Sequence, residues 1–453
     1  MATPRRTSKR SKSLLAIVAA GAFAFSLFIA VTGGFTSYVL GIRVSSHRVV
    51  PAMTIGWIAL LMLGSDAVRT RLVRASTLLR RNSRLVGMGI AAGTLIVGTS
   101  CGAFTAAGAD PYGYVSQARL WTTGSVVQPQ DQLAREAPWA NAAWSFSPLG
   151  YRPGTDPSYV VPAYPAGLPL QMALATKLGG MVVGYVVVPI LGALAVWLTF
   201  VLGRRVSGSG HGLAAALLFA CSPVFLFQLV QPMTDVPVTA WWLAAIVAAS
   251  SGRITGAVGA GLAASVAILT RPNLAVLLVP VCAYAWASRT PGKRWHALVA
   301  FTTAILPGLA MSAIVNALLY GTPLRSGYGG MSDIFHLSNL VPNIVRYPTW
   351  AVQTYSPFIF LGFVAPFLTH TSEAFRRTAW LTSSFAVLLL LSYVFYAPFD
   401  HWTYLRFLLP ATPLLFVMAV PTLDALLRRW ERVRTIAFAA IVSILAVSYI
   451  HTA

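Results

Sequence analysis

The sequence predicts an all-α membrane protein that crosses the bilayer many times. Of its 453 residues, 57% are hydrophobic and only 10% are charged, whereas soluble domains carry roughly a quarter charged residues. Several apolar runs reach the ~20 residues that a helix needs to cross a bilayer. The composition is therefore that of a polytopic membrane protein.

The apolar runs predict thirteen crossings. The first run, from Leu14 to Leu40, is too long for the core of a signal peptide and lacks a cleavage site, so we interpret it as a retained anchor. Residues 1–12 then form a basic cytoplasmic tail, and residues 13–453 form a single membrane domain. The crossings fall at residues 14–40, 49–66, 85–107, 182–203, 212–230, 236–251, 254–270, 274–288, 297–320, 355–370, 379–397, 406–423 and 435–451.

The formal net charge is +22, and the basic residues are distributed along the chain as the predicted topology requires. With the N-terminus inside the cell, the inner segments hold 23 of the 33 Lys and Arg residues, as the positive-inside rule requires. Seven of the eleven carboxylates lie on the outer side. The basic excess therefore reflects orientation in the membrane and does not indicate nucleic-acid binding. We expect the chemistry on the outer face.

Two outer loops, at about residues 110–181 and 321–354, are longer than a simple connection requires. The first opens with "DPYGYVSQARLWTTG", in which Asp110 suits a helix N-cap and Pro111 the first helical position. Tyr114 lies on the apolar face of this helix and Gln117 lies off it. The pattern predicts a helix on the membrane surface.

A second surface helix is predicted in the same loop. The stretch "YPAGLPLQMALATKLGG" opens with a Tyr-Pro-x-Gly-Leu-Pro pattern, and its helix should end near Lys177 and Gly179. The first outer loop is therefore expected to carry two surface helices.

Five stretches, in their order and spacing, resemble the GT-C superfamily of membrane glycosyltransferases. They are "ADPYGYVSQARLWTTG", "YPAGLPLQMALATKLGG", "FQLVQPMTDVPVTAWWLAA", "LTRPNLAVLLVP" and "WTYLRFLLPATPLL". The similarity covers residues 85–423 and favours the branch of the protein O-mannosyltransferases and the lipid A aminoarabinose transferase. Unlike much of that family, the chain has two additional crossings before the acidic loop, and Asp110 has no acidic neighbour in it.

The resemblance implies an inverting sugar transfer on the outer face of the plasma membrane. The donor would be a sugar on a polyprenyl phosphate, and the acceptor hydroxyl would belong to a glycan, a lipid or a protein. Such a reaction needs a carboxylate to take the hydroxyl proton and cations to stabilise charge on the leaving phosphate. The expected partners are these substrates and membrane lipids, with no nucleic acid.

Two aspartates are candidates for the catalytic carboxylate. Asp110 is the first choice for the base, and helix capping is its structural alternative. Asp235, in "QPMTDVP", is the second; it could instead cap a helix, bind acceptor, hold a metal or orient a cation. A requirement for a divalent metal ion stays open.

The remaining candidates would bind substrate. For the donor phosphate they are Arg406, Arg271, Arg325 and Lys177. Guanidinium groups match phosphate oxygens well, although each of these cations could equally meet lipid headgroups. For the rest of the substrates they are Tyr112, Tyr114, Gln117, Tyr164, His401 and Tyr404. Aromatic belts at membrane interfaces offer an alternative for the rings.

Two other classes of protein remain open. A polytopic transporter would have a similar composition, and a lipid-linked-sugar flippase could use the same fold without transferase activity. We find no repeat between the two halves of the chain, and the charged residues cluster at the outer boundary, which favours an enzyme over a transporter. Release of prenyl phosphate from a labelled donor would distinguish the enzyme from both.

Overall fold

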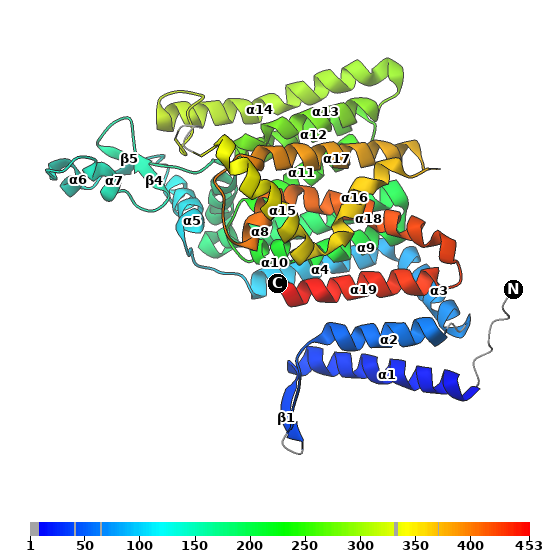
Figure 1. Cartoon of the computed structure of the whole chain (residues 1–453). Coiled ribbons are helices and arrows are strands. Elements are labelled where there is room, and N and C mark those ends of the chain that lie inside the picture. The colour runs from blue at the N-terminus through cyan, green and yellow to red at the C-terminus, as the bar shows by residue number, and fades with distance from the viewer. Residues whose placement is uncertain (1–8, 40–41, 64–65, 330–333, 370) are drawn as a thin grey trace.

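The computed structural model describes residues 9–39, 42–63, 66–329, 334–369 and 371–453, and these fold into a helical bundle (Figure 1). The predicted all-α class is confirmed. The α-helices are α1 (Lys9–Thr32), α2 (Val49–Leu63), α3 (Asp66–Arg81), α4 (Ser83–Ser100), α5 (Ala109–Thr122), α6 (Gln132–Glu136), α7 (Ala142–Ser145), α8 (Gly167–Ser207), α9 (Ser209–Ala220), α10 (Pro223–Leu229), α11 (Asp235–Ala249), α12 (Ile254–Thr270), α13 (Leu278–Ala287), α14 (Arg294–Tyr320), α15 (Leu340–Tyr355), α16 (Leu361–Val364), α17 (Glu373–Val394), α18 (Thr412–Leu426) and α19 (Arg434–Thr452).

Short 3₁₀ helices extend or join several of these elements. They are η1 (Pro272–Leu277), η2 (Pro291–Lys293), η4 (Leu337–Asn339), η5 (Pro357–Phe360), η6 (Ala365–Phe367), η7 (Trp402–Ala411) and η8 (Leu427–Trp430). Proline begins or interrupts most of them, because it lacks the amide proton that an α-helix needs. Both η1 and η7 carry functional candidates, as described below.

The described residues contain little strand. An antiparallel hairpin, β1 (Phe35–Val39) and β2 (Ile42–Ser46), follows α1. A small antiparallel sheet lies in the first outer loop, in the order β3 (Gln128–Pro129), β5 (Tyr159–Pro162), β4 (Tyr151–Pro153). Together with α6 and α7, this sheet forms a lobe that projects from one end of the bundle (Figure 1). We refer to residues 124–163 as the outer lobe.

The core of the bundle surrounds α11 and α18. Within the stretch from Trp402 to Trp430, 89% of an apolar 18-residue segment is buried. Within the stretch from Ser11 to Thr32, only 17% of such a segment is buried. A helix that is apolar on all sides is stable in the centre of a bundle or against lipid. The difference therefore indicates that η7–α18 is enclosed by other helices, whereas α1 presents most of its surface to the bilayer.

Among the described residues, six helices are long and apolar enough to cross a membrane, or up to eight spans if each bent pair counts as one. The remaining apolar helices, such as α11 and α12, have 10–17 residues. The count of thirteen crossings is thus not confirmed. The prediction for the first of them was too long: α1 ends at Thr32, where Gly33 and Gly34 take positive φ angles of 76° and 91° and lead into the hairpin.

Two other boundaries also differ from the prediction. The third crossing ends at Ser100 rather than at residue 107. The inner segment that contains Arg69 and Arg84 is largely the helix α3. Of the predicted basic tail, residues 1–8 lie outside the described residues. The second helix of the first outer loop is confirmed: α8 begins at Gly167 and is broken at Gly179 and Gly180.

The predicted inner and outer segments lie at opposite ends of the bundle. In Figure 1, α3 and the α13–α14 and α18–α19 connections lie at the right-hand end, whereas α5, the outer lobe and the loop after α14 lie at the left. The chain begins α1 at the right and ends α19 at the left. The segments that the charge count assigned to one side of the membrane are therefore neighbours in space.

Candidate active site

Two aspartate–arginine pairs meet at the end of the bundle that carries the outer lobe. Arg406 Nη2 lies 2.9 Å from Asp110 Oδ2, and Arg271 Nη2 lies 2.8 Å from Asp235 Oδ1. Arg406 Nη1 also lies 4.0 Å from Asp235 Oδ2, so Arg406 stands between the two carboxylates. Four residues from α5, α11, the turn after α12 and η7 thus form one cluster.

Asp110 does not cap its helix, contrary to the prediction. Gly108 is the N-cap residue of α5, with a φ of 84° that glycine adopts without strain, and Asp110 is the second residue of the helix. Its carboxylate instead accepts hydrogen bonds from Arg406 and from the hydroxyl of Tyr164, at 2.7 Å. The helix starts two residues earlier than expected, and the carboxylate faces the cluster instead of the helix end.

Asp235 is not a helix cap either. Thr234 is the N-cap residue of α11, and neither it nor Asp235 caps through a side chain. The Asp235 side chain is completely buried, and its Oδ2 accepts no hydrogen bond. A buried charge requires a partner, and Arg271 supplies it.

Arg271 is held rigidly at the turn between α12 and η1, as the sequence predicted. Its Nε donates to Thr234 Oγ1 at 3.1 Å and its Nη1 to the Tyr393 hydroxyl at 3.3 Å. Burial by itself lowers the pKa of Arg271, but Asp235 raises it and the net shift is upward. The group therefore stays a cation at every relevant pH.

The ring of Phe407 is shared by both arginines. The Arg271 and Arg406 guanidinium carbons lie 5.5 and 5.2 Å from its centroid. This is the range in which a cation is attracted to an aromatic face. Phe407 thus holds the two cations side by side without neutralising them.

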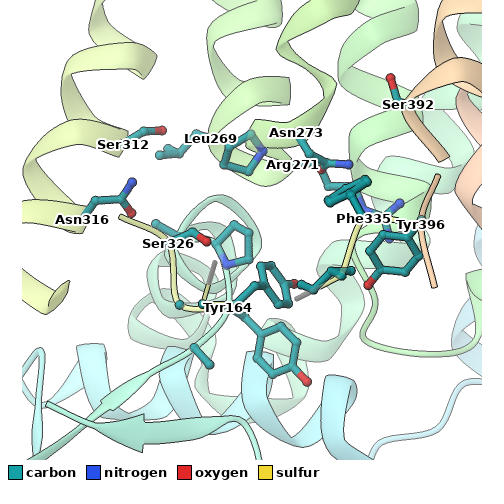
Figure 2. Close-up of a pocket in the computed structure, with 18 of the residues that line it drawn as sticks. Tyr164, Leu269, Arg271, Asn273, Ser312, Asn316, Ser326, Phe335, Ser392 and Tyr396 are labelled. Atoms are coloured by element: carbon teal, nitrogen blue, oxygen red, sulfur yellow. The ribbon is translucent and has the colours of Figure 1, made fainter. Parts of the chain in front are cut away.

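A cavity of about 680 Å³ adjoins the cluster, and Arg271 and Phe407 form part of its wall. In Figure 2, Ser312 and Asn316 of α14 lie on one side of it and Phe335 and Tyr396 on the other, with Arg271 and Asn273 between them. Leucine, valine and isoleucine side chains form much of the remaining wall. The cavity thus combines apolar walls with one cationic edge.

Tyr164 connects the cavity to Asp110, because it lines the cavity and donates to the carboxylate. Its ring centroid lies 4.8 Å from that of Tyr114, whose hydroxyl lies 3.3 Å from Thr234 Oγ1. Burial raises the pKa of Tyr114 to about 12, and burial together with Asp110 raises the pKa of Tyr164. Both hydroxyls therefore stay protonated.

The structure does not bring four of the predicted residues into the cluster. Arg325 and Lys177 have exposed side chains, and Tyr112 is 40% exposed on α5. Gln117 is completely buried, with no hydrogen-bond partner for its amide among the described residues, so the prediction that it lies off the buried face was wrong. None of the four is among the described residues that line the cavity.

His401 and Tyr404 support the cluster from the side. His401 is the N-cap residue of η7, and its Nδ1 accepts from the backbone amide of Thr403. Tyr404 stacks on Phe399 with ring centroids 3.7 Å apart, and the Arg406 guanidinium lies 5.4 Å from the Tyr404 ring. These contacts fix the start of η7 and hence the position of Arg406.

Sequence reasoning missed several residues of the site. Thr234 and Asn273 are direct neighbours of predicted residues, so extending those motifs by one or two positions would have found them. Asn273 Nδ2 donates to the Tyr393 hydroxyl at 3.0 Å. No sequence motif pointed to Tyr393 or Tyr328. Tyr393 lies within an apolar crossing, and Tyr328 lies in a glycine-rich loop.

The cluster does not fit a divalent metal ion in its present arrangement. Within the described ranges, no group of three or more His, Cys, Asp or Glu side chains is placed to hold one. Both carboxylates also direct oxygens at guanidinium groups. We therefore assign no step to a metal.

Comparisons with known proteins bear on the fold and the family. Residues 163–317 match the family model of dolichyl-phosphate-mannose-protein mannosyltransferases. A search of curated proteins gave no match. The crystal structure of ArnT from Cupriavidus metallidurans bound to undecaprenyl phosphate is similar, with 12% identity, a TM-score of 0.50, and coverage of 81% of this chain and 76% of that one.

Two further solved structures are similar. The same ArnT in the apo state has 12% identity and a TM-score of 0.50, with coverage of 80% of this chain and 75% of that one. The archaeal oligosaccharyltransferase AglB from Archaeoglobus fulgidus, in complex with an inhibitory peptide and a dolichol-phosphate, has 13% identity and a TM-score of 0.48, with coverage of 81% and 55%.

The apolar helices indicate an integral membrane protein, and the similarity to ArnT concerns its fold. The resemblance predicted from the sequence is confirmed: residues 163–317 match the mannosyltransferase family model, and the chain has the fold of the GT-C glycosyltransferase ArnT.

Proposed function

We propose that the protein is an inverting glycosyltransferase that moves a sugar from a polyprenyl-phosphate donor to an acceptor hydroxyl on the outer face of the plasma membrane. The observation that carries the proposal is the pair of aspartate–arginine contacts beside an apolar-walled cavity. Ionisable groups buried within a membrane protein are costly and are by default functional. The match to a lipid-phosphate-dependent family over residues 163–317 and the lipid phosphate bound to ArnT support the choice of donor.

The donor phosphate is assigned to Arg406 and Arg271. Arg406 has spare donors: its Nε has no hydrogen-bond partner, and its Nη1 makes only long contacts, at 3.9 Å with the sulfur of Met233 and at 4.0 Å with Asp235 Oδ2. Arg271 forms part of the cavity wall. Two cations on one aromatic ring would stabilise the charge that grows on the leaving phosphate.

Asp110 is assigned as the base in preference to Asp235. The side chain of Asp110 is 35% exposed, whereas that of Asp235 is completely buried. A base must reach the hydroxyl proton, so only Asp110 is accessible to an acceptor. Asp235 then has the role of orienting Arg271.

The reaction follows from these positions. The acceptor oxygen forms a bond to the anomeric carbon from the face opposite the phosphate, and its proton passes to Asp110. The bond between the anomeric carbon and the phosphate oxygen breaks, and its electron pair stays on the prenyl phosphate beside Arg406.

Release of prenyl phosphate tests the function directly. Purified protein in detergent is incubated with polyprenyl-phosphate sugars labelled in the lipid, together with glycan, lipid or peptide acceptors. We expect equal amounts of prenyl phosphate and glycosylated acceptor for at least one donor. A protein that only moves lipid-linked sugars across liposome membranes, without releasing prenyl phosphate, would be a flippase and would contradict the proposal.

Thiol labelling of intact cells tests the orientation. In a variant whose three native cysteines are replaced, a cysteine at Thr77 should be shielded from an impermeant reagent, and one at Asp156 should react. Both side chains are exposed in the structure, so a difference in labelling would report the side of the membrane and not burial within the protein. The opposite labelling pattern would place the cluster on the inner face.

A further inference from the structure

Arg152 of the outer lobe reaches a distant turn in the wall of the cavity. Its Nη1 donates to the backbone carbonyls of Gly327 at 3.1 Å and Ser326 at 3.4 Å, 175 and 174 residues further along the chain. Its guanidinium also lies 5.5 Å from the centroid of the Trp144 ring. No carboxylate within the described ranges forms an ion pair with Arg152, so its hydrogen bonds are directed at the turn.

The turn carries Tyr328 and packs on the backbone next to Tyr164. A Cβ atom at Gly327 would lie 2.1 Å from the carbonyl oxygen of Ala163, so only glycine permits this approach. Gly329 completes the turn with a φ of 89°. The hydrogen bonds of Arg152 and the close approach of Gly327 therefore fix the turn against residues 163 and 164.

Tyr328 contacts the residue that holds the proposed base. Its ring meets that of Tyr164 edge to face, with centroids 5.8 Å apart and planes at 83°. Tyr164 in turn donates to Asp110 at 2.7 Å. A continuous series of contacts thus runs from Arg152 through the turn and Tyr328 to Tyr164 and Asp110.

We propose that Arg152 is a positioning residue, which holds the turn of residues 326–329 so that Tyr328 keeps the Tyr164 hydroxyl on Asp110. The inference rests on the proposed role of Asp110 as the base. Arg152 touches neither Asp110 nor the arginines of the cluster in any contact that the structure shows. Its effect should therefore appear in turnover rather than in binding of the donor phosphate.

A double-mutant cycle on the full-length protein tests the proposal. Arg152→Ala should lower kcat on the order of 10- to 10²-fold, the usual cost of misplacing a reacting group, and leave the KM for donor nearly unchanged. In a Tyr164→Phe background the same substitution should have little further effect, because the two act through one hydrogen bond. Arg152→Lys should recover part of the rate, since it keeps one donor.

Arg135→Ala is the matched control, because Arg135 lies on the same lobe and has an exposed side chain. We expect it to leave kcat unchanged. Losses for Arg152→Ala and Tyr164→Phe that multiply in the double variant would overturn the proposal. If the wild type releases no prenyl phosphate from any donor, the proposed function fails, and the same variants are compared by melting temperature. Additive shifts would then also overturn the link between Arg152 and Tyr164.

Discussion

The two ends of the bundle use arginine differently. At the end that carries the outer lobe, the Arg271 and Arg406 side chains are 10% and 14% exposed, and both face carboxylates. At the opposite end, the arginines of α3 and of the α18–α19 connection are mostly exposed. Exposed arginines next to membrane spans set orientation, whereas buried ones require partners. Burial together with a carboxylate, rather than the number of arginines, thus distinguishes the candidate site.

One cluster at this opposite end resembles the candidate site in composition. Asp424 of α18 accepts from Arg434 Nε at 2.8 Å and lies 3.2 Å from His211 Nε2. The three residues join α9, α18 and α19. The cluster is not among the residues that line the large cavity, and it therefore provides a natural control for the outer pairs.

Removing the charge of Asp110 should have the largest effect on turnover. Asp110→Asn keeps the size of the side chain and can still accept from Tyr164, but it cannot take the acceptor proton. We expect transfer to fall on the order of 10²–10⁴-fold, the usual contribution of a positioned general base. The measurement is single-turnover transfer at saturating donor, with melting temperature as the control for folding. Near-normal transfer would move the search for the base to Asp235.

Removing the cation should have the next largest effect. Arg406→Ala should weaken donor binding and lower turnover on the order of 10²–10³-fold, the scale on which a single donor to a developing oxyanion acts. Arg406→Lys should recover only part of this, because an ammonium lacks the bidentate fork. The exposed inner arginine Arg429 is the control, and Arg429→Ala should leave donor KM and turnover unchanged. A purely structural role would show as reduced stability with normal kinetics per folded molecule.

Some features of the site could be predicted from the sequence because they depend on local chemistry. A carboxylate or guanidinium next to a span is unusual enough to be noticed, so Asp110, Asp235, Arg271 and Arg406 were found. Their pairing could not be predicted, because Asp110 and Arg406 are 296 residues apart and only the fold joins them. Helix capping was predicted for Asp110 and was one alternative for Asp235, and neither side chain caps a helix, since a preference for caps does not reveal a distant partner.

The prediction of the fold class was correct, but several predicted element boundaries were wrong. Apolar composition identifies helices, but it cannot separate the end of α1 from the strand β1, because both are apolar and only two glycines lie between them. The lobe sheet was also missed, since β3, β4 and β5 have only two to four residues each. Strands this short carry too little alternation to detect.

We expect the smallest effect on catalysis when the paired aspartates at the two ends, Asp235 and Asp424, are each changed to Asn. Asp424→Asn weakens charge-assisted hydrogen bonds to Arg434 and His211, and hydrogen bonds to charged groups contribute about 1.5–3 kcal/mol. We therefore expect a lower melting temperature and unchanged transfer per folded molecule. Asp235→Asn should also lower stability, because it leaves Arg271 buried without a counter-charge, but it should in addition raise the KM for donor as Arg271 loses its orientation. Thermal unfolding and steady-state kinetics on the same preparations distinguish the two ends. If Asp424→Asn raised the KM for donor as much as Asp235→Asn, an arginine buried beside a carboxylate would no longer locate the active site.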